Sequence, residues 1–388
     1  MTEPPSAGST EFAVSPHRSL TIVRGDGAVL WDDRGRRLVD LGATHGAGSL
    51  GAANPEVAAA VAAQARTLLY LGSGYANPVR TAFLEKLLHL LPSSFGRVFL
   101  SNSGTEAVEA GIKIARSATG RTRVVAAMRG FHGRTMGALS ATWRRELREP
   151  FEPLVPGFVH VPFNDVAALE AAVDETTALI LLEPVQGEGG VHVASEEFLH
   201  AARAVADRSG ALLAFDEVQT GIARTGRLFA FERWNVVPDL LLLAKSLAGG
   251  VPIGATVTTP EVERRFRGSH HSTFGGNPLA CAAGIAALDF TVRENLAGRA
   301  ERLGALASAK LSTLSLERVR EVRGLGLLIG VELREKVGPY LAALERRGFL
   351  ALPAGATVLR LLPPLVIPEA DWSAGLDAIA EVVENGAR

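Results

Sequence analysis

Two ionisable side chains follow apolar runs that have the composition of buried strands. Asp216 comes directly after the run 211–215, and Lys245 follows Leu240–Leu243 after one alanine. A lysine at the end of a buried strand either extends its charged end into solvent or stays neutral and acts as a nucleophile. A buried carboxylate needs a partner. Asp216 and Lys245 could therefore form a structural salt bridge, or they could hold a ring between them.

A possible anion site follows the apolar run 97–100. Ser103 and Glu106 match the capping box S-x-x-E, which opens a helix. Gly104 and Thr105 lie between them, where a glycine allows an anion to approach free backbone N–H groups and the threonine adds a hydroxyl. An ordinary capped helix is the alternative interpretation.

Two more polar stretches follow apolar runs. Residues 130–135 read GFHGRT, in which two glycines around an aromatic suit a flat ligand, and Arg134 could bind a carboxylate or lie in solvent. Glu183 directly follows a third buried run and opens the Gly-rich stretch 183–190. An acidic residue in that position favours a functional role, with a surface turn as the alternative.

Together these parts match the needs of pyridoxal phosphate in kind. That cofactor requires a lysine that binds it covalently, an acid beside its ring nitrogen and a phosphate-binding cup. Other chemistries have weaker support. Residues 46–51 match G-x-G-x-x-G, but no clear βαβ unit surrounds them, and the motifs of P-loop proteins, zinc proteases and serine hydrolases are absent. His270 and His271 lack the spacing of metal ligands on a helix, so we expect no metal.

The elements that must position these residues form a regular alternation. Apolar runs lie at 97–100, 124–128, 159–161, 179–182, 211–215 and 240–243, and Ala-rich helical stretches at 106–118, 166–173 and 195–208 separate most of them. Strands that alternate with helices predict an α/β fold with a mostly parallel sheet and helices on both faces. Such sheets bind ligands at the carboxyl ends of their strands.

Three segments are predicted along the chain. Residues 1–50 hold a polar arm (1–15) and a hairpin signal near 28–40, residues 51–290 form the large domain, and residues 291–388 form a small α+β domain. The strands of the small domain could pair with the N-terminal hairpin. The sequence alone does not decide this pairing.

Bulk properties exclude several classes. The 388 residues carry a formal charge of −1, which gives no reason to expect nucleic acid or an anionic membrane as a partner. Cys281 is the only cysteine, so an intrachain disulfide is excluded. No apolar run reaches the length of a membrane span, and the polar N-terminus does not read as a signal peptide. We expect a cytoplasmic protein.

At its motifs the chain resembles the class III, ornithine-type aminotransferases, which are pyridoxal-phosphate enzymes of fold type I. The resemblance runs from about Gly25 to the C-terminus. It is most specific at SNSGTEAVEA, GFHGRT, LLEPVQGEGGV, FDEVQTG, LLAKSLAGGVPIGA, STFGGNPLACA and LRLLPPLVI.

The resemblance implies roles for the matched residues. Lys245 would bind the cofactor covalently and later move a proton, and Asp216 would pair with the ring nitrogen. Members of this family form homodimers with the site at the interface, so Thr273 would come from a second subunit. The other cofactor contacts would come from Gly104, Thr105, Phe131, Glu217, Val218 and Gln219.

Substrate contacts are implied in the same way. Arg134, with Ser272 nearby, would hold a substrate carboxylate, and Arg360 would bind the α-carboxylate of glutamate. Glu183 would pair with Arg360 when the donor carries a distal amine, so that one pocket accepts both an ω-amine and glutamate. The reaction would be a ping-pong exchange between that amine and 2-oxoglutarate.

Within that family, the chain most resembles the subgroup of the acetylornithine aminotransferases. Within it, residues 139–155 are similar to enzymes that act on carrier-linked (LysW) aminoadipate semialdehyde in lysine biosynthesis. An acidic carrier would favour a basic rim, for which the candidates are Arg144, Arg145 and Arg148, or Arg264, Arg265 and Arg267.

Three departures from the family pattern, Ala223, Ala52-Ala53 and the loop 72–75, bear on side-chain specificity rather than on the cofactor. Acetylornithine aminotransfer in arginine biosynthesis remains an alternative, alone or as a second activity. Racemisation and mutase chemistry are further alternatives within pyridoxal enzymes. A non-enzymatic binding protein with a structural Asp216–Lys245 pair is the alternative from a different class.

Overall fold

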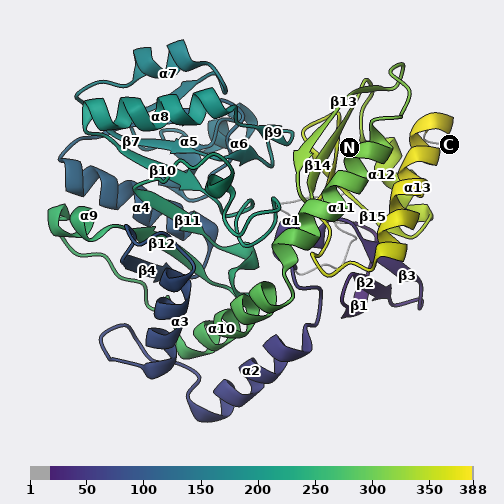
Figure 1. Cartoon of the computed structure of the whole chain (residues 1–388), viewed down its shortest axis with the longest axis horizontal. Coiled ribbons are helices and arrows are strands. Elements are labelled where there is room, and N and C mark those ends of the chain that lie inside the picture. Colours follow the sequence, from purple (N-terminus) through teal and green to yellow (C-terminus); the bar gives the residue numbers. More distant parts are fainter. Residues whose placement is uncertain (1–17, 387–388) are drawn as a thin grey trace.

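A computed structural model describes residues 18–386, so the predicted arm at 1–15 lies outside the described part. The chain forms a large half around one sheet and a smaller half built from both ends of the sequence (Figure 1). Within residues 18–386, no helix combines the length and the hydrophobicity that crossing a membrane requires.

The large half contains a seven-stranded sheet in the order β4-β12-β11-β10-β7-β5-β6. Its strands are β4 (Arg97–Ser101), β5 (Arg123–Ala127), β6 (Phe158–Val161), β7 (Thr177–Leu182), β10 (Leu212–Asp216), β11 (Leu240–Leu243) and β12 (Gly254–Thr258). Every pairing from β11 to β6 is parallel, which confirms the mostly parallel sheet. β12 runs antiparallel to both of its neighbours. The sequence analysis missed it because its residues, GATVT, carry little apolar volume.

β11 is buried on both faces, as its four leucines predicted. Leu240 and Leu242 lie in one apolar cluster with side chains of α4 (Gly104–Thr119). Leu241 and Leu243 lie in the other cluster, with side chains of α8 (Glu196–Ser209). Because successive side chains of a strand point to opposite faces, helices must cover both sides of the sheet.

Other helices of the large half surround these layers. They are α2 (Pro55–Thr67), α3 (Pro78–His89), α5 (Met136–Ala141), α6 (Arg145–Arg148), α7 (Val166–Ala172), α9 (Pro260–Arg265) and α10 (Pro278–Arg293), with the 3₁₀ turns η1 (Glu149–Phe151), η2 (Ala230–Arg233) and η3 (Lys245–Ala248). Helix α10 was not predicted. The connection from β10 to β11 contains η2 and no α-helix.

The smaller half joins the two ends of the chain. β1 (Ile22–Asp26), β2 (Val29–Asp32) and β3 (Arg37–Asp40) form the predicted hairpin region, and β3 pairs in parallel with β15 (Phe349–Leu350). The pairing between N- and C-terminal segments, left open by the sequence, is therefore present. The division of the chain at residues 50 and 290 stays a prediction.

A second sheet of the smaller half has the order β13-β14-β17-β16. Its strands are β13 (Val319–Leu325), β14 (Leu328–Leu333), β17 (Val358–Leu361) and β16 (Leu352–Ala354). The helices that accompany it are α11 (Leu296–Leu311), α12 (Gly338–Arg346) and α13 (Glu369–Asn385). The short helix α1 (Ala43–Gly46) and the hairpin of β8 (Val185–Gln186) and β9 (His192–Val193) complete the described elements.

Candidate active site

Lys245 and Asp216 lie at one edge of the large sheet. β10 and β11 are neighbouring parallel strands, with Asp216 opposite Leu242, and Lys245 begins η3 two residues beyond β11. Adjacent parallel strands present their carboxyl ends at the same edge, where α/β sheets bind ligands. The predicted placement of the two residues is confirmed.

Lys245 is a strained and partly buried amine. It lines a cavity of about 1550 Å³ and has a φ of +42°, a backbone conformation that costs energy for a residue with a side chain. Burial lowers the pKa of Lys245 below its ordinary value, although the nearby carboxylate of Glu188 opposes this shift. A lowered pKa leaves more of the amine neutral, which is the form that acts as a nucleophile.

Asp216 is paired with a histidine rather than with Lys245. Its Oδ2 accepts a hydrogen bond from His132 Nδ1 at 2.8 Å, and its Oδ1 accepts one from the backbone N–H of Val218 at 3.1 Å. Burial alone would lower the pKa of His132, but the bond to Asp216 outweighs it and raises that pKa. Among residues 18–386, these contacts replace the Asp216–Lys245 salt bridge, so the structural-pair interpretation is wrong.

Helix α4 opens with the predicted cap. Ser103 Oγ accepts from the backbone N–H of Glu106 at 3.3 Å and donates to the Glu106 carboxylate at 2.8 Å. Within the described residues, the N–H groups of Gly104 and Thr105 have no acceptor. Free N–H groups at the start of a 16-residue helix form an anion site, because the helix dipole adds to their partial charge.

Glu183 is a buried carboxyl directly after β7. Its Oε2 accepts from the backbone N–H of Phe131 at 2.9 Å. Burial raises the pKa of Glu183 to about 8, so it holds a proton at neutral pH. The sequence analysis assigned Glu183 to Arg360, but the structure places it against the loop of Phe131 instead.

The partner of Arg360 is Glu188. Arg360, on β17, is fully buried, and its Nη1 donates to Glu188 Oε1 at 2.6 Å. Burial raises the pKa of Glu188, but the hydrogen bond from His45 and the charge of Arg360 outweigh it, so that pKa lies well below the ordinary range. Both glutamates belong to the same Gly-rich loop, and in this structure Glu188 rather than Glu183 pairs with Arg360. The sequence analysis did not single out Glu188, and the pairing of Glu183 with Arg360 when a distal amine is bound stays a prediction.

Gln219 and Glu217 have different environments. Gln219 Oε1 accepts from Arg360 Nη1 at 3.2 Å, which brings the amide to the site. The Glu217 carboxylate turns away and accepts from the backbone N–H groups of Ala230 and Phe231 at 2.7 and 2.8 Å. It holds the start of η2, so the expected cofactor role of the Glu217 side chain is not supported.

The remaining predicted residues divide between two cavities. Phe131 and Arg134 line the cavity of Lys245, together with Glu188. Ser272 and Thr273 line a separate pocket of about 390 Å³. Ser272 Oγ accepts from Asn102 Nδ2 at 3.1 Å there.

A lysine of lowered pKa, a buried Asp–His pair and an open helix N-terminus at one sheet edge define a pyridoxal-phosphate enzyme. The chain belongs to the class-III aminotransferase family, whose model matches residues 12–383. It is a transaminase, and its cofactor is pyridoxal phosphate. Amino acids and 2-oxoglutarate-type acceptors are the substrates of such enzymes.

Individual relatives agree with this assignment. The chain is 47% identical to the acetylornithine aminotransferase of Methanopyrus kandleri, over 94% of each chain. It is 46% identical to the LysW-aminoadipate semialdehyde transaminase of Deinococcus radiodurans, over 94% of this chain and 86% of that one. The ornithine aminotransferase of Toxoplasma gondii, with pyridoxal phosphate at partial occupancy, superimposes with a TM-score of 0.91 at 35% identity, over 96% and 92% of the two chains. The fold is accordingly fold type I.

The residues of the site fit this cofactor. A Cβ at Gly104 would lie 2.7 Å from Val218 Cγ1, so a glycine is needed where the helix meets that side chain. A Cβ at Gly133 would lie 2.3 Å from Thr105 Oγ1. Because glycine has no Cβ, it leaves room for the threonine hydroxyl at the helix start. Donor groups for a phosphate, a carboxylate for a ring nitrogen and an amine are all present at one edge.

Proposed function

We propose that Lys245, Asp216 and the start of α4 hold pyridoxal phosphate. Lys245 would bind it covalently, Asp216 would pair with its ring nitrogen, and Gly104 and Thr105 would bind its phosphate. The observation that carries this proposal is the adjacency of Asp216 and Lys245 on parallel neighbours β10 and β11. Further contacts are assigned to Phe131 and Val218 on the two faces of the ring and to Gln219 at its phenolic oxygen.

When bound, pyridoxal phosphate supplies an electron sink for the substrate carbon that carries the amine. Lys245 Nζ, whose pKa is lowered by burial, would take the proton from that carbon and return it one position away. The Asp216 carboxylate, fixed by His132, would favour a proton on the ring nitrogen. The two half-reactions follow a ping-pong order.

Arg360 and Glu188 would choose between the two classes of amino donor. While they are paired, Glu188 neutralises the charge of Arg360, which suits an ω-amine donor. Glutamate brings a second carboxylate, which needs the guanidinium of Arg360 and displaces Glu188. Arg134, on the exposed side of the cavity, is assigned to the carboxylate of the ω-amine donor.

We propose carrier-linked L-lysine, interconverted with aminoadipate semialdehyde, as the ω-amine donor. The cavity of about 1550 Å³ reaches from Lys245 to Arg144, Arg145 and Arg148, whose charges would suit an acidic carrier. Arg264 and Arg265, the rival cluster, belong to α9 and do not line this cavity. The Deinococcus radiodurans relative carries this activity in its name.

Acetylornithine is the second candidate donor, as the sole substrate or beside carrier-linked lysine. The observation that favours it is the 47% identity to the acetylornithine aminotransferase of Methanopyrus kandleri. Both donors present an ω-amine and would use the same Lys245 and Arg360.

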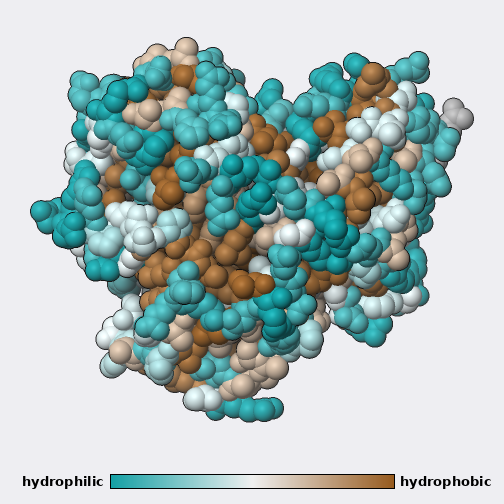
Figure 2. Space-filling view, viewed as in Figure 1, coloured by the Kyte–Doolittle hydropathy of each residue, from teal (hydrophilic) through white to brown (hydrophobic). Residues whose placement is uncertain are grey.

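We further propose a cytoplasmic homodimer in which Thr273 completes the partner's phosphate site. Thr273 is exposed, and its backbone carbonyl accepts from Tyr70 Oη at 2.9 Å. Leu69, Tyr70 and Phe274 are exposed apolar side chains. Figure 2 shows hydrophobic residues gathered between β12 and α10 on this face of the large half. Exposed apolar surface of this kind favours a subunit contact.

The test begins with the purified protein and added pyridoxal phosphate. We expect a visible absorbance that glutamate bleaches, and turnover of carrier-linked lysine at a higher kcat/KM than acetylornithine. The Lys245→Ala protein should lose both the absorbance that glutamate bleaches and the turnover of either donor. A Lys245→Ala protein that completes full turnovers would refute the cofactor assignment, and a preference for acetylornithine would select the second donor.

A further inference from the structure

The hairpin of β8 and β9 carries Glu188 but lies against the smaller half. Val185 and Val191 share a buried apolar cluster with Leu328 of β14 and Leu362, which follows β17. A Cβ at Gly330 of β14 would lie 3.0 Å from Val191 Cβ, so the contact between hairpin and sheet is close. The loop that bears Glu188 is therefore supported by the sheet that bears Arg360.

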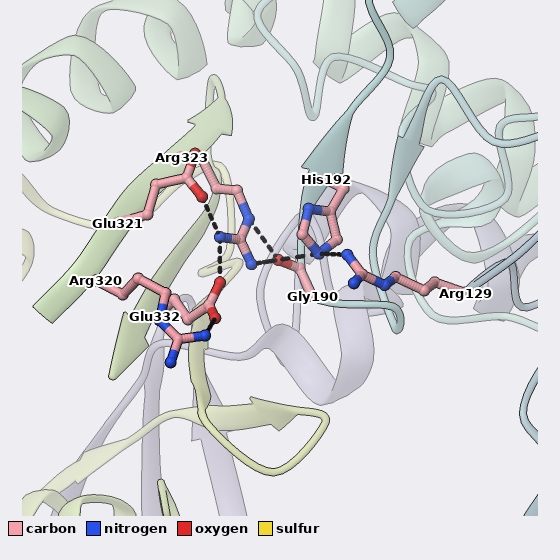
Figure 3. Close-up of polar contacts among 7 residues, drawn as sticks. All are labelled: Arg129, Gly190, His192, Arg320, Glu321, Arg323 and Glu332. Atoms are coloured by element: carbon pink, nitrogen blue, oxygen red, sulfur yellow. Dashed lines mark hydrogen bonds and ion pairs between the residues drawn. The ribbon is translucent and has the colours of Figure 1, made fainter. Parts of the chain in front are cut away.

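One arginine of that sheet donates hydrogen bonds directly to the loop. Arg323, on β13, donates from Nε and Nη2 to the carbonyl oxygen of Gly190 at 2.9 and 2.6 Å (Figure 3). Gly190 is two residues from Glu188. The Arg323 side chain is only 8% exposed, so these charge-assisted hydrogen bonds are largely shielded from water.

The guanidinium is itself held in place. Glu321 and Glu332 are directly opposite each other on β13 and β14, where two like charges repel. Arg323 Nη1 donates to both carboxylates at 2.6 Å, which removes the repulsion and fixes the guanidinium plane. Arg320 Nη1 donates to the other oxygen of Glu332 at 3.0 Å.

The loop is also contacted from the large half. Arg129 Nη1 lies 2.9 Å from His192 Nε2 (Figure 3). A Cβ at Gly189 would lie 2.3 Å from the backbone oxygen of Arg129. Burial and the charges of Arg323 and Arg129 lower the pKa of His192 to about 4, so the ring is neutral and its Nε2 accepts from Arg129. The loop thus has little freedom while Arg323 holds Gly190.

We propose that Arg323 is a positioning residue for substrate choice: by holding the Gly190 carbonyl, it keeps Glu188 within reach of Arg360. This inference rests on the proposed switch between an ω-amine donor and glutamate. Arg323 is not among the residues that line the cavity of Lys245. Its loss should free Glu188 from Arg360, which penalises the ω-amine donor and spares glutamate, because glutamate displaces Glu188 in any case.

The test compares Arg323→Met with Arg320→Met. Methionine keeps length but cannot donate to Gly190, and Arg320 is the matched control because it binds the same Glu332 without contacting the loop among the described residues. We expect Arg323→Met to lower kcat/KM for the ω-amine donor by about tenfold relative to that for glutamate, because the charged hydrogen bonds to Gly190 that hold the loop are lost. Arg320→Met should leave the ratio unchanged.

Hydrogen–deuterium exchange of the cofactor-loaded protein supplies a readout independent of turnover. Amides of residues 187–192 should exchange faster in Arg323→Met than in wild type, and at the wild-type rate in Arg320→Met. In Arg323→Lys, which keeps the charge but not the paired donors, these amides should exchange at a rate between those of wild type and Arg323→Met. Arg323→Lys replaces Arg323→Met in the test if the methionine variant does not fold.

The outcomes separate this inference from the proposed function. If wild type turns over neither donor, the proposed function fails. Suppose that wild type is active and that Arg323→Met changes kcat/KM equally for both donors, for neither donor, or lowers it more for glutamate. Each of these results would overturn the positioning role of Arg323. Unchanged exchange at 187–192 would overturn it as well.

Discussion

His132 Nδ1 lies 2.8 Å from Asp216 Oδ2, and both side chains are almost completely buried. A buried carboxylate without a partner loses its hydration free energy, and His132 offsets this loss for Asp216. The sequence analysis had expected the partner to be either Lys245 or a bound ring. The pair also places behind the carboxylate an imidazole whose pKa is raised by that carboxylate. The negative charge that faces the cavity is therefore fixed in orientation.

The first prediction concerns the stability of the protein freed of pyridoxal phosphate. The pKa of His132 is raised in the folded protein above the ordinary 6.5. Its contribution is complete below about pH 6.5 and is lost as the pH rises through the raised value. His132→Gln should lower the free energy of unfolding by about 2 kcal/mol at pH 6, since a buried charged hydrogen bond is lost, and by less at pH 9.

Urea unfolding at several pH values measures this effect. His89→Gln is the control, because His89 is exposed at the end of α3 and should change stability by less than about 0.5 kcal/mol. A destabilisation by His132→Gln that stays constant from pH 6 to pH 9 would contradict the raised pKa.

The second prediction concerns Asp216 itself. Asp216→Asn removes the negative charge but keeps the shape, so the fold should persist while kcat falls by about 100-fold or more. Steady-state kinetics and circular dichroism together measure the two properties. Near-normal turnover would show that the carboxylate does not act on the ring nitrogen.

The third prediction separates the two glutamates of the Gly-rich loop. Glu188→Gln removes the charge that pairs with Arg360, so Arg360 should bind glutamate more readily and the KM for glutamate should fall by about tenfold. The ω-amine donor should lose efficiency. Glu183→Gln is the matched comparison, since Glu183 is already protonated at neutral pH and contacts Phe131 rather than Arg360.

Kinetics with each donor at pH 7 distinguish the two variants. A shift in donor preference with Glu183→Gln but not with Glu188→Gln would restore the original assignment from the sequence.

Much of the large half could be predicted because its signals are local. The leucines of β11 predict a strand, and the capping box at Ser103 predicts the start of a helix, each from a few neighbouring residues. The alternation of strands and helices then predicts that Asp216 and Lys245 lie at the same edge of the sheet. Strand β12 was missed because burial of small side chains leaves no pattern along the chain.

The substrate end of the site depends on contacts between distant segments. Glu183 and Glu188 are five residues apart in one loop, and nothing in the loop indicates which one reaches β17 in the other sheet. His132 was within a recognised motif, yet its bond to Asp216 joins residues 84 apart. The proposed role of Thr273 depends in addition on a second subunit, and the sequence of one chain does not show which surfaces meet in a subunit contact.

The fourth prediction tests the contact between the helix start and the loop of Val218. Gly104→Ala would place a Cβ 2.7 Å from Val218 Cγ1, so Val218 must move and the phosphate end of the cofactor should bind about tenfold more weakly. Titration of visible absorbance with pyridoxal phosphate measures this. Adding Val218→Ala removes the clashing atoms, so the double variant should recover part of the affinity. If Gly104→Ala alone binds as wild type does, the close approach at α4 has no role in holding the phosphate.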